Sequence, residues 1–149
     1  MTVGVPTETF PGERRVATIP AVVPALTKAG LDVLLEPGAG GSAGFLDATY
    51  TNKGARVAGD RAQLFADADV ILQVRALGAN TVAGRADLEL FRPGQIVIGF
   101  SEPLDEPQAA RDLAAQGVTA LSMELIPRIT RAQSMDALSS MAPIAGYKA

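Results

Sequence analysis

The sequence predicts a doubly wound α/β fold, with a mostly parallel, flavodoxin-like sheet in a single domain. Short apolar runs alternate with segments of helical periodicity, which is the pattern of parallel strands joined by crossover helices. The apolar runs are nearly continuous, as expected of strands that are covered on both faces. The chain has 149 residues, which fits one domain.

Five apolar runs predict the main strands of this sheet. They span residues 2–6, 31–36, 68–74, 95–100 and 118–123, and a short sixth strand is expected at 56–58. Helices are expected at 19–29, 60–66 and 106–116. The first and third of these helices are each followed by a glycine, Gly30 and Gly117, which is typical of a helix end.

The composition excludes several classes of function. The 13 basic and 16 acidic residues give a net charge of −3, which does not favour binding to nucleic acid. No apolar run reaches the length of a membrane span, and the N-terminus lacks the pattern of a signal peptide, so a cytoplasmic location is expected. The chain contains neither Cys nor His, which excludes thiol chemistry and removes the commonest general base. No metal site is expected.

A glycine-rich segment at 38–44 follows the second predicted strand. A dinucleotide-binding fingerprint needs three glycines at fixed spacing that open a helix, because the helix N-terminus holds the pyrophosphate. Here Gly44 falls one residue late, and no acidic residue ends a following strand at the right distance. We therefore expect a turn-rich loop that does not hold the phosphates of NAD.

Two arginines follow predicted strands. Arg15 lies in the loop after the first strand, and Arg75 comes directly after Val74. Loops at the carboxyl ends of parallel strands are where open α/β sheets bind ligands, and a guanidinium can clamp a carboxylate or phosphate. The sequence thus predicts an anion pocket formed by Arg15 and Arg75, with a solvated surface pair as the alternative.

The segment after the last predicted strand is the richest in polar groups. Thr130 and Gln133 have the spacing of a capping box. Asp136 and Ser139 are three residues apart, so one helical turn would place them on the same face. Together with Arg128 and Gln133 they offer donors and acceptors for a flat amide such as nicotinamide. The alternative is a capped connection between sheet and helix.

The same segment carries a resemblance to a known family. Residues 127–140 (PRITRAQSMDALSS) and 144–147 (IAGY) resemble the signature of the alpha subunit of proton-translocating NAD(P) transhydrogenases. Residues 3–6 (VGVP), with Glu8 and the run from Glu13 to Ala17, resemble the wider family that includes alanine dehydrogenases. The glycine-rich loop after Glu36 fits that wider family as well. The resemblance covers the whole chain.

The resemblance implies a role in hydride transfer between NADH and NADP. It implies that NAD(H) binds mostly to a following Rossmann domain, which is absent from this sequence, and that the nicotinamide contacts Arg128, Asp136 and Ser139. Gln133 would lie near the hydride-transfer interface, and Tyr147 matches a tyrosine in the interdomain helix. The implied partners are an NADP(H)-binding component and a membrane component, with a homodimer and a location peripheral to the inner membrane.

The resemblance also argues against an alanine dehydrogenase. Those enzymes are expected to use a lysine at the position of Arg75 and a histidine further on to handle pyruvate, and this chain has no His. A second hypothesis, ahead of alanine dehydrogenase, is a non-catalytic interaction domain that pairs with a separate NAD-binding chain or with itself. Its contact surface would be the apolar segment at 138–147.

The expected organisation is a domain at 1–141, followed at 142–149 by the start of a truncated interdomain helix. Proline suits the first turn of a helix and not its interior, so Pro143 predicts that this helix starts nearby. Residues 134–140 would then form at most a short separate turn. The chain by itself is expected to have no turnover and to bind NADH weakly or not at all.

Overall fold

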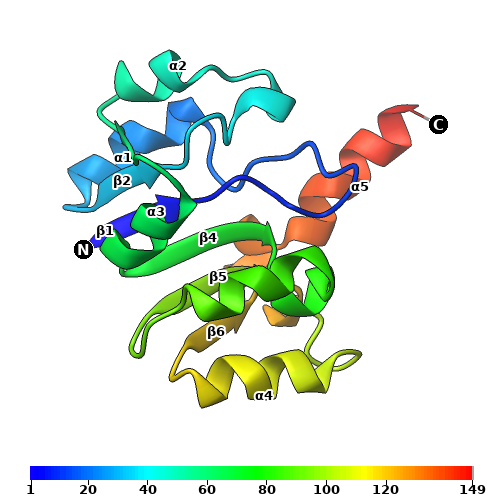
Figure 1. Ribbon diagram of the computed structural model, residues 1–149. Coiled ribbons are helices and arrows are strands. Elements are labelled where there is room, and N and C mark those ends of the chain that lie inside the picture. Colours follow the sequence, from blue (N-terminus) through cyan, green and yellow to red (C-terminus); the bar gives the residue numbers. More distant parts are fainter. Residues whose placement is uncertain (149) are drawn as a thin grey trace.

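A six-stranded parallel sheet forms the centre of the computed structural model, which describes residues 1–148 (Figure 1). The strand order is β3-β2-β1-β4-β5-β6. If the two-residue edge strand β3 is set aside, the other five have the 2-1-3-4-5 order of flavodoxin-like sheets, as the sequence predicts. The strands are β1 (Thr2–Val5), β2 (Asp32–Leu35), β3 (Arg56–Val57), β4 (Val70–Arg75), β5 (Ile96–Phe100) and β6 (Thr119–Ser122).

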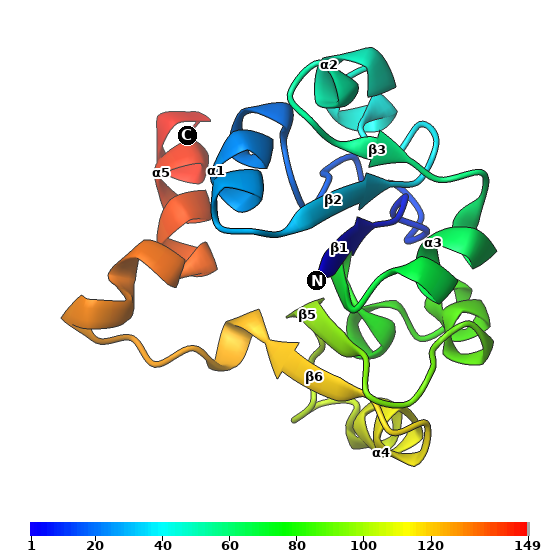
Figure 2. The same cartoon turned by 90° about the vertical axis from the view of Figure 1, so that its left-hand side faces the viewer.

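Helices lie on both sides of this sheet (Figure 2). One side carries α1 (Val23–Lys28) and α2 (Asp47–Thr51), and the other carries α3 (Arg61–Asp67) and α4 (Pro107–Ala115). A longer helix, α5, follows the sheet at Ala137–Lys148. Short 3-10 helices connect these elements: η1 (Pro20–Val22), η2 (Gly41–Ala43), η3 (Leu77–Asn80), η4 (Ala83–Glu89), η5 (Met123–Leu125) and η6 (Thr130–Met135).

The predicted helices at 19–29, 60–66 and 106–116 are confirmed with small shifts of their ends. Sequence patterns missed α2 and the 3-10 helices η3 and η4. Elements of this kind are too short to show a clear periodicity in the sequence.

Two apolar cores pack against the two faces of the sheet. The larger core joins α3, α4 and η4 to β4 and β5, and its centre includes Leu64, Phe65, Ile71 and Val97. The smaller core joins α1 and α2 to β1 and β2 and contains the fully buried Tyr50. Both cores reach residues at the carboxyl ends of the strands and so support the loops at that edge.

A buried ion-pair network ties those strand ends together around Arg61. Its Nε and one terminal nitrogen each donate a 2.7 Å hydrogen bond to the Asp87 carboxylate. The other terminal nitrogen lies 2.6 Å from the carboxylate of Glu36 at the end of β2. Gln73 of β4 also donates to Asp87, at 2.9 Å. One guanidinium thus connects β2, α3 and η4.

The start of α5 differs from the prediction made from Pro143. The helix begins at Ala137, and Pro143 lies inside it. The Asp136 carboxylate accepts hydrogen bonds from the amides of Leu138 (3.0 Å) and Ser139 (3.3 Å), and this cap starts the helix upstream of the proline. The predicted capping box of Thr130 and Gln133 is wrong, since no side chain caps η6.

Candidate functional site

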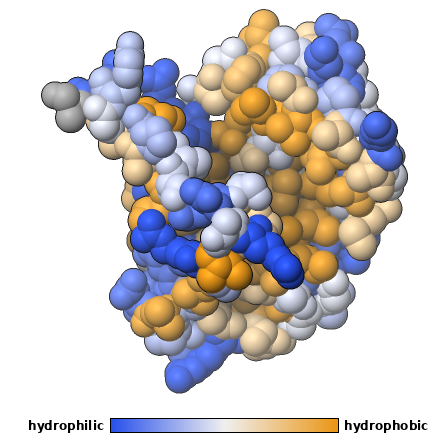
Figure 3. Space-filling view, turned by 180° about the vertical axis from the view of Figure 1, so that it is seen from behind, coloured by the Kyte–Doolittle hydropathy of each residue, from blue (hydrophilic) through white to orange (hydrophobic). Residues whose placement is uncertain are grey.

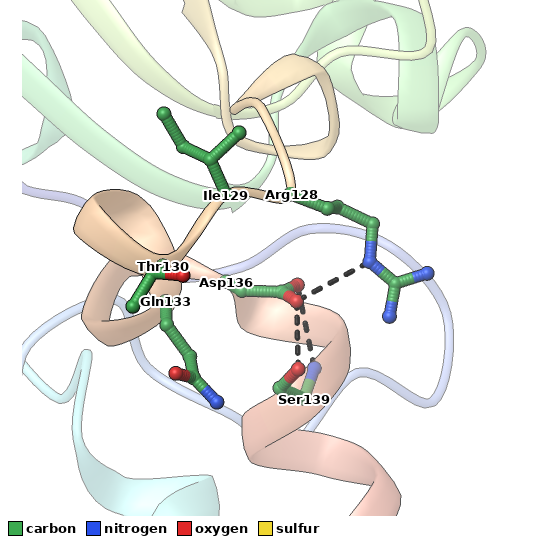
Figure 4. A pocket seen from close by; sticks show the side chains of 6 residues that line it. All are labelled: Arg128, Ile129, Thr130, Gln133, Asp136 and Ser139. Carbon is green, nitrogen blue, oxygen red and sulfur yellow. Dashed lines mark hydrogen bonds and ion pairs between the residues drawn. The ribbon is translucent and has the colours of Figure 1, made fainter.

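A polar pocket of about 290 Å³ lies where η6 meets the start of α5 (Figure 4). All four residues that the sequence singled out for nicotinamide line this pocket. Its lining comprises Arg128, Ile129, Thr130, Gln133, Asp136 and Ser139. The chain brings them together because η6 and the first turn of α5 fold back on the segment that follows η5.

The Asp136 carboxylate is the centre of this pocket. The Ser139 hydroxyl donates to its Oδ2 at 2.7 Å, and Arg128 Nε lies 3.4 Å from the same oxygen (Figure 4). The hydrogen bond from Ser139, supported by two backbone amides and by Arg128, lowers the pKa of Asp136 below its usual value. Asp136 is therefore an ionised acceptor at neutral pH.

Donors and acceptors face each other across the pocket. The Arg128 side chain is 68% exposed, so its remaining nitrogens are accessible to a ligand. Gln133 lies on the side of the pocket away from Arg128, and its amide can both donate and accept (Figure 4). A planar carboxamide, which has one acceptor oxygen and two N–H donors, fits this combination of groups.

Arg15 and Arg75 approach each other at the carboxyl edge of the sheet, with Glu13 between them. Arg15 forms two hydrogen bonds with the Glu13 carboxylate at 2.7 and 2.5 Å, and Arg75 Nε lies 3.1 Å from it. The bonds from Arg15, followed by that from Arg75, lower the pKa of Glu13 to about 2. The structure thus places both guanidiniums on one carboxylate, and Glu13 neutralises one of the two positive charges.

The two arginines line a cavity of about 200 Å³ together with Phe100, Glu102 and Met141. Met141 belongs to α5, and its sulfur lies 3.3 Å from a terminal nitrogen of Arg15. A neighbouring apolar cavity of about 320 Å³ shares Phe100 and Met141 with it, and shares Arg128 and Asp136 with the polar pocket. Sequence reasoning missed Glu13, Phe100 and Met141 as site residues. Only the position of Phe100 at a strand end could have indicated it.

The glycine-rich loop forms turns, as expected. Gly44 has a φ of +87°, which favours glycine, and the loop leads only into the three-residue η2. The amide of Gly38 donates to both oxygens of Asp47 at 3.0 Å. The Gly38 amide, which would have to donate to a bound phosphate, is therefore already bonded within the protein.

Two further properties concern residues 1–148 as a whole. Within this part of the chain, no helix combines the length and the apolar character needed to cross a membrane. The same residues contain no group of three or more Asp or Glu side chains arranged to bind a metal ion.

Known proteins resemble this chain over its whole length. It is 42% identical to an NAD(P) transhydrogenase subunit alpha from Cereibacter sphaeroides, covering all of this chain and 27% of that protein. It is 36% identical to an NAD(P) transhydrogenase subunit alpha from Haemophilus influenzae, covering all of this chain and 28% of that protein. An alanine dehydrogenase from Mycobacterium tuberculosis is 34% identical over 98% of this chain and 37% of its own length.

The solved structure of a transhydrogenase from Sinorhizobium meliloti matches with a TM-score of 0.90 and 42% identity. The match covers all of this chain and 42% of that one. The chain thus spans only about a quarter to two fifths of the length of its relatives. Residues 4–145 match the family described as "Alanine dehydrogenase/PNT, N-terminal domain". The chain therefore belongs to the alanine dehydrogenase/PNT N-terminal domain family.

Proposed function

We propose that this chain forms one wall of the NAD(H) site in a proton-translocating transhydrogenase. The observation that carries the proposal is the convergence of Arg128, Gln133, Asp136 and Ser139 on one pocket, in a chain similar to transhydrogenase alpha subunits. Most of the contacts to NAD(H) would come from a Rossmann domain outside these residues. NADP(H) would be bound by a partner component, and a membrane component would couple hydride transfer to proton movement.

The pocket residues would bind and orient the carboxamide of the nicotinamide. Asp136 is ionised and accepts from an N–H of the carboxamide, Arg128 donates to its oxygen, and Ser139 keeps Asp136 in place. The bound cofactor supplies the chemistry, which is a direct hydride transfer between nicotinamide rings. This transfer needs no general base, which agrees with a chain that has no His. The contribution of these residues is position and electrostatics.

The chain by itself would have no turnover and would bind NADH weakly, because only one side of the cofactor is contacted. The proposed location is cytoplasmic and peripheral to the inner membrane through the partner components. The alternative of an alanine dehydrogenase is disfavoured by the absence of His and by Arg75, which the resemblance places where those enzymes have a lysine.

A titration monitored by NMR tests the proposal directly. Reduced nicotinamide mononucleotide is added to the 149-residue chain at millimolar concentrations, and backbone amide shifts are followed. We expect shifts confined to residues 128–139, and a weaker response in Ser139→Ala. Ser140→Ala is the matched control, since the Ser140 hydroxyl bonds to the Ala137 carbonyl and does not line the pocket.

Two results would contradict the proposal. The first is the absence of any shift at residues 128–139 with saturating mononucleotide. The second is micromolar affinity of the chain for NADH, since this would mean that the whole cofactor binds without a second domain.

A further inference from the structure

The Glu124 carboxylate holds the carboxyl end of β5. Glu124 lies in η5, directly after β6, and its Oε1 accepts hydrogen bonds from two consecutive amides, those of Ser101 (2.9 Å) and Glu102. Two successive amides that point at one acceptor form a small anion-binding concavity in the backbone. Here the anion is a side chain of the same protein, so η5 is fastened to the neighbouring strand through one oxygen atom.

The turn that carries these two amides is strained. Glu102 has a φ of +45°, in the left-handed region that residues other than glycine seldom adopt. Such a conformation persists only where neighbouring interactions hold it. The hydrogen bonds to Glu124 come from the backbone of this turn and stabilise it, so the end of β5 and η5 depend on the same carboxylate.

A short and constrained stretch of backbone joins Glu124 to Arg128. Ile126 has a φ of −60° and a ψ of 125°, the extended conformation that a following proline favours. The ring of Pro127 fixes its own φ. The Ile129 amide then donates to the Pro127 carbonyl at 2.9 Å, which closes a three-residue turn centred on Arg128. Few rotations remain free between the two residues, so a movement of Glu124 shifts the Cα of Arg128.

The Arg128 side chain itself is held weakly. Its Nε lies 3.4 Å from Oδ2 of Asp136, and the side chain is 68% exposed. An exposed ion pair of this length adds little stability, so it does not fix the position of the guanidinium. Arg128 also borders the apolar cavity of about 320 Å³, where Leu138 and Met141 of α5 offer no oxygen acceptor, and Figure 3 shows apolar surface beside α5. The position of the guanidinium therefore depends on the backbone that Glu124 anchors.

We infer that Glu124 is a positioning residue of the nicotinamide pocket and acts through Arg128. Glu124 does not line the polar pocket, so it places the donor without touching the cofactor. The inference rests on the proposed function, in which Arg128 donates to the carboxamide oxygen. Loss of Glu124 should weaken only this donor side, because the Asp136 carboxylate is held separately by the Ser139 hydroxyl and by two amides of α5.

Binding of reduced nicotinamide mononucleotide to the 149-residue chain, followed by NMR, tests this role. Glu124→Ala removes both hydrogen bonds at the β5 end and should raise the dissociation constant about 10-fold, which corresponds to the loss of one well-placed hydrogen bond from Arg128 to the ligand. Glu124→Gln keeps an oxygen acceptor at the same reach, so its dissociation constant should stay within about 3-fold of the original. Glu89→Ala is the matched control, since it removes a carboxylate at an exposed position outside the pocket.

Two further measurements distinguish positioning from a general loss of structure. Without ligand, the Nε–H signal of Arg128 should move in Glu124→Ala and stay in place in Glu124→Gln, while the amides of Leu138 and Ser139 keep their shifts in both. In a chain that already carries Arg128→Ala, adding Glu124→Ala should change the dissociation constant by less than about 2-fold, because the two changes remove the same contact. Circular dichroism verifies folding, and Glu124→Asp, one methylene shorter, takes the place of Glu124→Ala if that variant does not fold.

The possible failures are distinguishable. Equal binding of the mononucleotide with and without Glu124 would overturn the inference and leave the proposed function intact. Losses from Glu124→Ala and Arg128→Ala that simply add would do the same, as would an Arg128 signal that does not move in Glu124→Ala. If the original chain shows no response to the mononucleotide, the proposed function fails and the inference fails with it.

Discussion

The Ser139 hydroxyl donates a 2.7 Å hydrogen bond to Oδ2 of Asp136, while the Ser139 amide lies 3.3 Å from Oδ1 of the same carboxylate. One aspartate therefore both starts α5 and forms the acceptor of the polar pocket. The proposed cofactor contact and the stability of the helix depend on the same group.

Replacing Asp136 separates these two roles. Asp136→Ala removes the cap, and we expect the amides of Leu138 and Ser139 to exchange with solvent several-fold faster. Asp136→Asn keeps an acceptor oxygen for the helix but loses the charge, so amide exchange should stay close to that of the original chain. Hydrogen exchange followed by NMR measures both. Equal exchange rates in the two variants would argue against the cap.

The Arg61 network should be a main contributor to stability. Arg61→Met leaves Asp87, whose side chain is 5% exposed, without its bidentate partner. We expect the free energy of unfolding to fall by about 3–5 kcal/mol, because an uncompensated charge remains buried. Arg85→Met is the control, since its pair with Asp112 is exposed and should matter little. Urea denaturation of both variants checks this, and similar midpoints would contradict it.

Glu13 predicts a dependence of stability on pH. Its pKa is lowered from 4.5 to about 2 in the folded chain. The contribution of Glu13 to the free energy of unfolding is therefore complete above pH 4.5 and is lost as the pH falls towards 2. The contribution is on the order of 1 kcal/mol, because Arg15 is half-exposed and solvent screens the pair. Glu13→Gln should therefore be less stable at pH 7, with a difference that shrinks below pH 4.5.

Thermal unfolding at several pH values measures this difference. Glu89→Gln is the control, because it also removes one carboxylate but at an exposed position. The stability of this variant should differ little from that of the original chain over the same pH range. A constant difference between Glu13→Gln and the original chain from pH 7 to pH 3 would show that ionisation of Glu13 is not responsible.

Gly78 should be intolerant of a side chain. A Cβ at this position would lie 1.7 Å from the carbonyl oxygen of Ser101, so the backbone of η3 or of the β5 end would have to move. We expect Gly78→Ala to lower the free energy of unfolding by about 3 kcal/mol. Gly41→Ala is the comparison, because no atom lies within 4 Å of the added carbon. A stable Gly78→Ala protein would show that this contact can relax.

Pro143 should weaken α5 from within. It lacks the amide that would bond the carbonyl of Ser139, so Pro143→Ala should stabilise the local helix by about 1–3 kcal/mol. Slower amide exchange at residues 144–147 measures this. Pro107→Ala is the control, since Pro107 lies at the start of α4, where its amide would have no helical partner. Equal effects of the two substitutions would contradict the prediction.

Much of the fold follows from local patterns along the chain. Continuous apolar runs identify the strands, and glycines such as Gly30 and Gly117 identify helix ends. Both signals can be read from the sequence because each depends only on residues that are close together in the chain. The elements that sequence patterns missed, α2 and the 3-10 helices, are only three to seven residues long, which is too short for an apolar stripe to repeat several times. The prediction from Pro143 misplaces the start of α5, because the cap at Asp136 depends on a side-chain hydrogen bond that no periodicity reports.

The fold class, the family and the residue types of the candidate site follow from the order of amino acids alone. The sequence motif at residues 127–140 is enough to select Arg128, Gln133, Asp136 and Ser139 as candidate nicotinamide contacts. Three-dimensional packing was needed to show that Glu13 lies between Arg15 and Arg75, and that Met141 of α5 lies against Arg15. Both depend on contacts between residues far apart in the chain, which are set by strand order and crossover handedness and leave no trace in local spacing.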